Sequence, residues 1–122
     1  MGTLNDQGLP PTYPFKPELE MTPRSAMVHL EGGGLLIDCR TEKEWQTAHI
    51  EGAVLVPLNE LESRLEELEE HRDQTIAIMC HMGGRSMRAT LLLRSLGFTQ
   101  AMSVAGGIDL WAIDIDPKIP RY

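Results

Sequence analysis

Apolar positions along the chain form short runs that alternate with longer segments of helical periodicity. The runs that predict strands are residues 35–38, 53–57, 75–80 and 101–104. Residues 75–80, TIAIMC, are apolar at nearly every position, as expected of a strand that is covered on both faces. Strands that alternate with helices indicate an α/β fold with a small, mostly parallel sheet flanked by helices.

Capping signals mark where the predicted helices begin and end. Thr22 and Pro23 have the residue types of an N-cap and a first helical position, and glycines 32–34 end this helix. Thr41 and Glu44 have the spacing of a capping box, so a short helix begins there. The other predicted helices cover 58–71, with leucines 58, 61, 65 and 68 on one stripe, 86–98 and 106–115.

The first 17 residues differ from the rest because they contain four prolines, at 10, 11, 14 and 17. We expect residues 1–17 to form an extended, proline-rich arm and residues 18–122 to form one domain. A chain of 122 residues is long enough to bury a core without disulfides.

Charge and cysteine content narrow the classes of partner and compartment. The net charge of −7 argues against nucleic acid or an anionic membrane as a partner, because both favour a basic surface. The two cysteines, Cys39 and Cys80, do not form a disulfide framework, and the N-terminal residues lack a secretory pattern. We therefore expect a cytoplasmic protein. With no CxxC motif and no closely spaced histidine pair, no metal site and no cofactor are expected.

The segment CHMGGRS, residues 80–86, follows a predicted buried strand. Gly83 and Gly84 permit a turn whose N–H groups point at one centre, and the helix that follows adds its positive N-terminal end. Arg85 adds a permanent positive charge. These features favour the thiolate of Cys80, so we expect a nucleophile on an exposed loop. A purely structural, buried cysteine would leave the Gly-Gly-Arg-Ser sequence unexplained.

Residues near this loop have plainer interpretations as well. Asp38 and Arg40 flank Cys39 at the end of another predicted parallel strand, so they reach the same sheet edge, where we expect an ion pair that braces the loop. His81 either tunes the site or shuttles protons, or it faces solvent and contributes only its N–H. Met82 is a candidate apolar rim for an acceptor.

Three separated motifs resemble the rhodanese family. CHMGGRS resembles its active-site loop, LLIDCRTEKEWQTAHIEGAVLVP resembles its upstream signature, and LGFTQAMSVAGGIDLW resembles its downstream stretch. Together they cover the chain from about residue 18 onward. The resemblance implies the three-layer rhodanese-like fold, with about five strands, and the activity of a thiosulfate sulfurtransferase.

By this resemblance, Cys80 is the catalytic nucleophile and carries a persulfide. The donor is thiosulfate or another small sulfur-containing anion, or a persulfide, and the acceptor is a thiophile or a protein. Backbone N–H groups of 81–85 (His81, Met82, Gly83, Gly84, Arg85) would cradle the donor, with Arg85 holding its charge. Asp38, Arg40 and Ser86 would support the loop. Cys39 either resolves the persulfide as a disulfide or is a small apolar residue, the interpretation we favour.

Three alternatives remain open at this point. One is a protein-to-protein sulfur-relay module with little activity on thiosulfate. Another is an inactive regulatory domain, which the presence of Cys80 disfavours. The third is a cysteine-dependent phosphatase; the related cell-cycle phosphatases have five residues between cysteine and arginine, whereas this chain has four.

Overall fold

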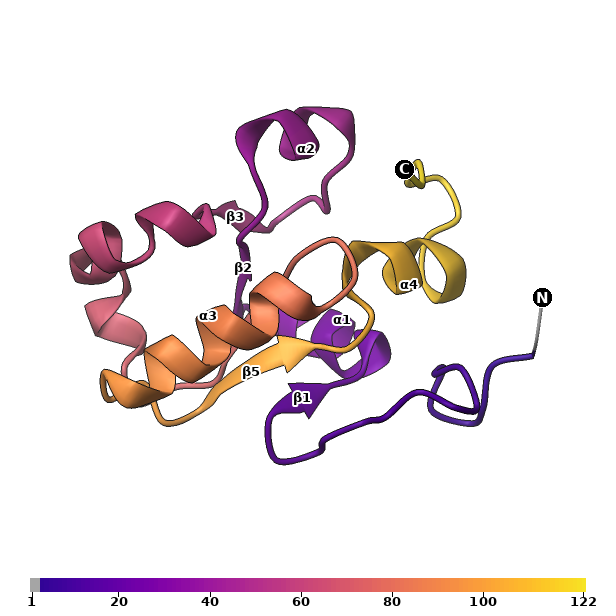
Figure 1. Cartoon of the computed structure of the whole chain (residues 1–122), viewed down its shortest axis with the longest axis horizontal. Helices are drawn as coiled ribbons and strands as arrows, with labels where there is room; N and C mark the ends of the chain where they lie inside the picture. The colour runs from indigo at the N-terminus through magenta and orange to yellow at the C-terminus, as the bar shows by residue number, and fades with distance from the viewer. Residues whose placement is uncertain (1–2) are drawn as a thin grey trace.

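The structure, a computed structural model, describes residues 3–122 and is built on a sheet of five strands (Figure 1). All pairs in the sheet are parallel, and the strand order is β1-β5-β4-β2-β3. The bounds are Glu20–Met21 for β1, Leu35–Asp38 for β2, Val54–Leu55 for β3, Ile76–Met79 for β4 and Ala101–Val104 for β5. The predicted α/β fold with a small parallel sheet of five strands is confirmed.

Four α-helices and two 3-10 helices connect the strands. Their bounds are Pro23–Glu31 for α1, Glu42–Thr47 for α2, Leu58–Glu60 for η1, Glu62–His71 for η2, Gly84–Ser95 for α3 and Gly107–Asp114 for α4. The Thr22 hydroxyl caps α1, and Thr41 with Glu44 forms the predicted capping box of α2. Within residues 3–122, none of the helices combines the length and apolar character needed to cross a membrane.

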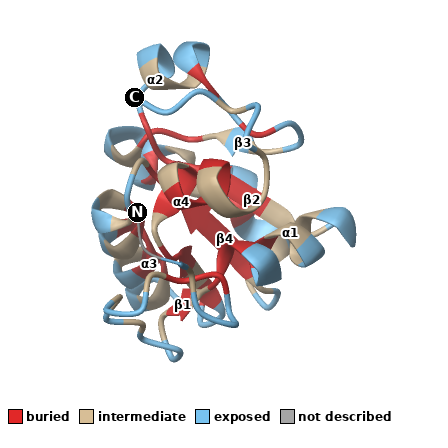
Figure 2. Cartoon of the chain, turned by 90° about the vertical axis from the view of Figure 1, so that its right-hand side faces the viewer, coloured by how far each residue is buried: buried red, intermediate tan, exposed pale blue. Residues whose placement is uncertain are grey.

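The sheet is the middle of three layers, and its central strands β2, β4 and β5 are largely buried on both faces (Figure 2). Alternate residues of β4 divide between the faces: Ile76 and Ile78 pack in one core cluster, and Ala77 and Met79 in the other. The first cluster is covered by α3 and the 3-10 helices, and the second by α1 and α4. This alternation places the next side chain, Cys80, on the face that α3 covers.

Residues 58–71 differ from the single α-helix that their leucines predict. The backbone forms two 3-10 helices, and Arg64 inside η2 departs from helical geometry at φ −113° and ψ 16°. Leu61 and Leu68 are buried, and Leu58 and Leu65 pack against the same cluster. The spacings of three, from 58 to 61 and from 65 to 68, suit a 3-10 helix, which has three residues per turn, and the spacing of four between 61 and 65 includes the irregular Arg64. The predicted buried stripe is therefore present, on a tighter backbone.

The segment before the sheet packs on the domain. Residues 3–19 run through turns without a helix or strand, and Leu9 is only 2% exposed. Leu9 packs in a third cluster with Ala105 and Leu110, next to the start of α4. Residues 1 and 2 of the predicted arm lie outside the described residues. Strand β1, two residues long at the sheet edge, has no sequence pattern that predicts it.

Candidate functional site

Cys80 lies directly after β4, at the carboxyl edge of the parallel sheet where ligands bind in open α/β folds. The Gly83 N–H donates a hydrogen bond to Cys80 Sγ at 3.0 Å. Ser86 Oγ, in the first turn of α3, lies 3.3 Å from the same sulfur. Both contacts and the positive end of α3 favour negative charge on this sulfur. The residue is 1% exposed, so the thiol lies at the base of the loop rather than on an exposed loop as expected.

A second hydroxyl supports Ser86 from the sheet. Ser103 Oγ of β5 is 2.8 Å from Ser86 Oγ, and both serines are buried. Ser86 Oγ donates to the Gly83 carbonyl at 3.2 Å. When Cys80 is a thiolate, the sulfur can only accept, so Ser86 can turn its single proton to the sulfur while the Ser103 hydroxyl donates to Ser86. Ser103, Ser86 and Cys80 therefore form a chain of hydrogen bonds that can stabilise a thiolate. No sequence pattern indicated Ser103.

The start of α4 holds the first residues of the loop. The Ile108 N–H donates to the Cys80 carbonyl at 2.9 Å, and the Asp109 N–H donates to the His81 carbonyl at 3.1 Å. Gly107, at φ +59°, lets the two backbones approach: a Cβ there would lie 2.5 Å from both carbonyl oxygens. The second glycine of the Gly106-Gly107 pair is thus required by this contact.

The two glycines inside the loop have different roles. Gly83 has φ +116°, a conformation that side chains rarely adopt, and it directs its N–H at the sulfur. Gly84 is absent from the positive-φ set of the described residues and has open space around it. Met82 is 64% exposed, which leaves it free to form a rim.

Arg85 is held by a carboxylate of α2. Its Nη1 and Nη2 donate to Glu44 Oε1 and Oε2 at 2.6 and 2.9 Å. The hydrogen bonds to Arg85 hold the pKa of Glu44 far below its usual range, and Glu44 in turn raises the pKa of Arg85. The sequence pattern indicates Glu44 only as a capping-box residue, because Arg85 lies 41 residues away along the chain.

Tyr122 connects both ends of the loop. Its ring stacks on His81 with centroids 4.0 Å apart and an interplanar angle of 8°. Its hydroxyl donates to Glu44 Oε2 at 2.6 Å and accepts from Arg40 Nη1 at 2.7 Å. Burial and the bond to Glu44 raise the pKa of Tyr122 to about 12. No motif indicated this residue.

Asp38 and Arg40 form the predicted ion pair, and both side chains are fully buried. Arg40 Nη2 donates to Asp38 Oδ2 at 2.7 Å and to the Ala48 carbonyl at 2.6 Å. Arg40 Nε donates to both Asp38 oxygens. The pair thus ties the end of β2 to the segment after α2.

Cys39 lies beside Cys80 because β2 and β4 are neighbours, with Asp38 paired to Met79. Both cysteines are free and buried. Burial and the neighbouring Cys80 raise the pKa of the Cys39 thiol well above its ordinary value. This environment favours a protonated, apolar side chain.

Tyr13 approaches the loop from the other side. Its hydroxyl donates to Glu20 Oε2 at 2.6 Å, and a Cβ on Gly83 would lie 3.8 Å from that hydroxyl. Burial and Glu20 raise the pKa of Tyr13. The segment before the domain therefore contributes a residue next to the Cys80 loop.

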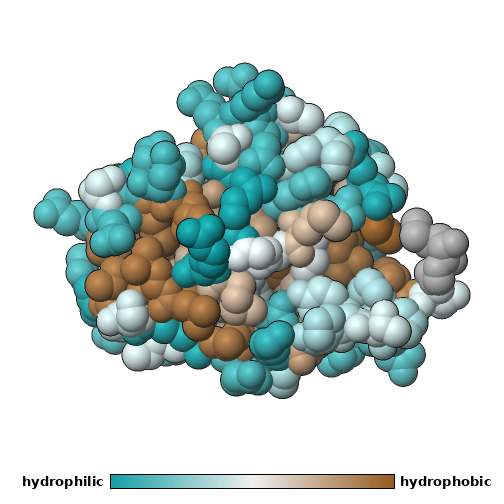
Figure 3. Space-filling view, viewed as in Figure 1, coloured by the Kyte–Doolittle hydropathy of each residue, from teal (hydrophilic) through white to brown (hydrophobic). Residues whose placement is uncertain are grey.

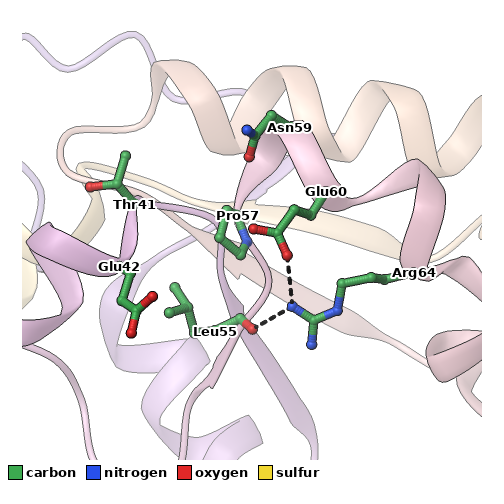
Figure 4. Close-up of a pocket in the computed structure, with 7 residues that line it drawn as sticks. All are labelled: Thr41, Glu42, Leu55, Pro57, Asn59, Glu60 and Arg64. Carbon is green, nitrogen blue, oxygen red and sulfur yellow. Dashed lines mark hydrogen bonds and ion pairs between the residues drawn. The ribbon is translucent and has the colours of Figure 1, made fainter.

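The surface around the site is uneven. Figure 3 shows hydrophilic atoms over α2 and an apolar area over α3, where Leu91 and Leu96 are exposed. A hollow of about 370 Å³ opens beside β3 (Figure 4). It is lined by Thr41, Glu42, Leu55, Pro57, Asn59, Glu60 and Arg64. None of these lining residues belongs to the 80–86 loop. Within residues 3–122, no group of three His, Cys, Asp or Glu side chains is placed to hold a metal ion.

Comparisons with known proteins agree on one family. Residues 22–114 match the model of the Rhodanese-like domain. The adenylyltransferase and sulfurtransferase MOCS3-1 of Zea mays is 37% identical over 93 residues, which are 72% of this chain and 20% of that protein. The putative sulfur carrier protein YrkF of Bacillus subtilis is 34% identical over 95 residues, 78% of this chain and 50% of that protein. The chain thus spans half or less of these two relatives.

Solved structures give the same result. Reduced CoADR-RHD of Bacillus anthracis matches with a TM-score of 0.75 and 32% identity, over 83% of this chain and 18% of that one. The human single-domain sulfurtransferase TSTD1 matches with a TM-score of 0.68 and 28% identity, over 77% of this chain and 95% of that one.

Proposed function

The chain belongs to the rhodanese-like domain family, and from this premise we propose that it transfers sulfane sulfur through a persulfide on Cys80. The resemblance predicted from the three motifs is thereby confirmed at the level of the family. The observation that carries the proposal is the environment of Cys80 Sγ, which the Gly83 N–H and the Ser86 hydroxyl contact at the positive end of α3. A thiolate is the nucleophilic form of a cysteine, and these two contacts can donate hydrogen bonds to it.

In the first half-reaction the Cys80 thiolate attacks the outer sulfur of a donor. A bond forms between the two sulfurs, and the donor's own sulfur bond breaks with its electron pair leaving on the carrier. With thiosulfate the leaving group is sulfite; with a thiol persulfide it is the thiolate of the carrier. The Gly83 N–H, which donates to Cys80 Sγ, stabilises the charge that develops on the sulfurs.

In the second half-reaction an acceptor nucleophile attacks the outer persulfide sulfur. The sulfur–sulfur bond breaks, and Cys80 recovers its electron pair as a thiolate. The acceptor is a small thiophile or a protein thiol, and Met82 is an exposed contact for it. Because the two substrates react in turn, ping-pong kinetics are expected. We assign the reaction to a reducing, cytoplasmic setting, in which Cys80 stays a thiol.

A sulfur-relay module is the second candidate, and the pairing of Arg85 with Glu44 favours it because a charge that is already neutralised attracts anions weakly. The name of YrkF describes that relative as a putative sulfur carrier. The phosphatase alternative has weaker support, since four residues separate Cys80 from Arg85 and leave a shorter loop for a phosphate group.

The test is the intact mass of the reduced protein after brief incubation with thiosulfate or, separately, with 2-mercaptoethanol persulfide. Wild type and a Cys39→Ser control should each gain one sulfur atom from at least one donor, and Cys80→Ser should gain none. If wild type gains no sulfur from either donor, or Cys80→Ser gains as much as wild type, a Cys80 persulfide is refuted. Hydrolysis of an aryl phosphate without sulfur gain would favour the phosphatase.

A further inference from the structure

Arg85 is the charged residue of the loop, yet its charge is matched by Glu44. Both outer nitrogens of the guanidinium bond to the two carboxylate oxygens in a paired geometry, and both side chains are partly sheltered from water. Paired bonds of this kind are stronger and more specific than a single contact. A donor anion would have to compete with Glu44 for this guanidinium.

Glu44 is itself fixed by groups other than Arg85. The Tyr122 hydroxyl donates to Oε2 at 2.6 Å, and the Thr41 N–H donates to Oε1 at 3.3 Å as part of the capping box. Tyr122 is held in turn by Arg40 and by its stacking on His81. The carboxylate therefore has little freedom to swing away when a second anion approaches.

The neighbouring cations do not replace Arg85. Arg40 is buried and paired with Asp38. Arg88 is exposed on α3, three residues beyond Arg85 and so about 4.5 Å further along the helix axis from the loop. The Gly83 N–H and the N-terminal end of α3 suit one negative sulfur, whereas thiosulfate brings two charges to the site.

We infer that Glu44 is a specificity-determining residue that neutralises Arg85 and so selects sulfane sulfur on a thiol carrier over thiosulfate. The inference rests on the proposed function and names its donor class. For this donor the Cys80 thiolate attacks the outer sulfur of R–S–SH, the S–S bond of the donor breaks, and R–S⁻ leaves with the bond's electron pair. The outer sulfur keeps its proton, so charge and electrons balance without a further reagent.

The experiment measures kcat/KM for thiosulfate and for 2-mercaptoethanol persulfide, whose carrier is uncharged. Glu44→Gln removes the charge but keeps an amide that can still complete the capping box. Glu42→Gln is the matched control, because it makes the same charge change two residues away on an exposed side chain of α2.

In wild type, kcat/KM for the persulfide should exceed that for thiosulfate by about tenfold or more. Glu44→Gln should raise kcat/KM for thiosulfate about tenfold through a lower KM, as one uncompensated charge near a dianion allows. Glu44→Gln should change kcat/KM for the persulfide by less than about twofold. Glu42→Gln should leave kcat/KM unchanged for both donors. If Glu44 had a purely structural role, Glu44→Gln would lower kcat/KM for both donors together and leave the ratio of the two values unchanged.

The inference is overturned if wild type prefers thiosulfate, or if Glu44→Gln leaves the ratio of the two donors as it is in wild type. These results leave the proposed function standing, since sulfur still reaches Cys80. Absence of sulfur on Cys80 with both donors, in wild type and both variants, would instead refute the proposed function and the inference with it.

Discussion

Replacing Gly107 by alanine tests whether the start of α4 shapes the Cys80 loop. An added Cβ would lie 2.5 Å from the carbonyl oxygens of Cys80 and His81, which are backbone atoms that no rotamer change can move aside. The backbone at φ +59° adds strain of about 1 kcal/mol for a residue with a Cβ. Overpacking of this kind costs about 1–3 kcal/mol more. We therefore expect a loss of about 2–4 kcal/mol in the free energy of unfolding.

The variant should remain mostly folded at 25 °C but lose activity. A loss of this size lowers the melting temperature by roughly 10 °C in a chain of this length. To relieve the clash, the loop must move away from α4, which disturbs the bonds from Ile108 and Asp109 and the position of Cys80. Sulfur uptake by the folded protein, followed by mass spectrometry, should slow by about tenfold or more, as expected when reacting groups are displaced.

Gly33→Ala is the matched control. Gly33 also has positive φ, at +89°, but a Cβ there meets nothing within 4 Å. Gly33→Ala should lower the free energy of unfolding only by the backbone strain, about 1 kcal/mol, and should leave sulfur uptake unchanged. Equal melting temperatures for the two variants, together with normal sulfur uptake by Gly107→Ala, would refute the argument that the close approach to α4 positions the loop.

Three further predictions concern the loop and the residues next to it. Gly83→Ala should abolish most sulfur uptake, because its φ of +116° directs the N–H at the sulfur, whereas Gly84→Ala should retain uptake within about threefold; equal losses in a mass assay would contradict this. Asp38→Asn should lower the free energy of unfolding by about 3–5 kcal/mol, because it leaves a buried guanidinium without its counter-charge; urea denaturation measures this, and a loss below 1 kcal/mol would show that the pair contributes little. The burial-raised pKa of Cys39 keeps that thiol protonated at pH 8, since the thiolate forms only above the raised value. Native Cys80→Ser should therefore take up no iodoacetamide at pH 8 but react fully in urea, and rapid native labelling would refute a buried, neutral Cys39.

Local signals predicted the fold and the position of Cys80 at the end of a buried strand. The cap at Thr22 and the capping box at Thr41 lie within four residues of their partners, so sequence spacing was enough to identify them. The apolar run before Cys80 likewise predicted a strand buried on both faces. Strand β1 and the 3-10 form of 58–71 could not be predicted in this way, because edge pairing and helix type depend on packing against distant elements.

The charge balance of the site depends on contacts over long sequence distances. Arg85 pairs with Glu44 across 41 residues, and Glu44 bonds to Tyr122 across 78. From sequence, Arg85 is a free positive charge; in the structure it belongs to a neutral pair. This difference changes the expected donor, because a free guanidinium attracts a compact anion and a neutralised one does not.

The residues that frame the Cys80 loop come partly from outside the family-matched region, 22–114. On one side Tyr13 bonds to the buried carboxylate of Glu20 beside Gly83; on the other, Tyr122 bonds to Glu44 and covers His81. These are the two tyrosines of the chain. The matched region supplies Cys80, the Ser86 hydroxyl and the Gly83 N–H. The flanking segments add one tyrosine on each side of this loop, so we expect donor and acceptor preference to change when Tyr13 or Tyr122 is replaced.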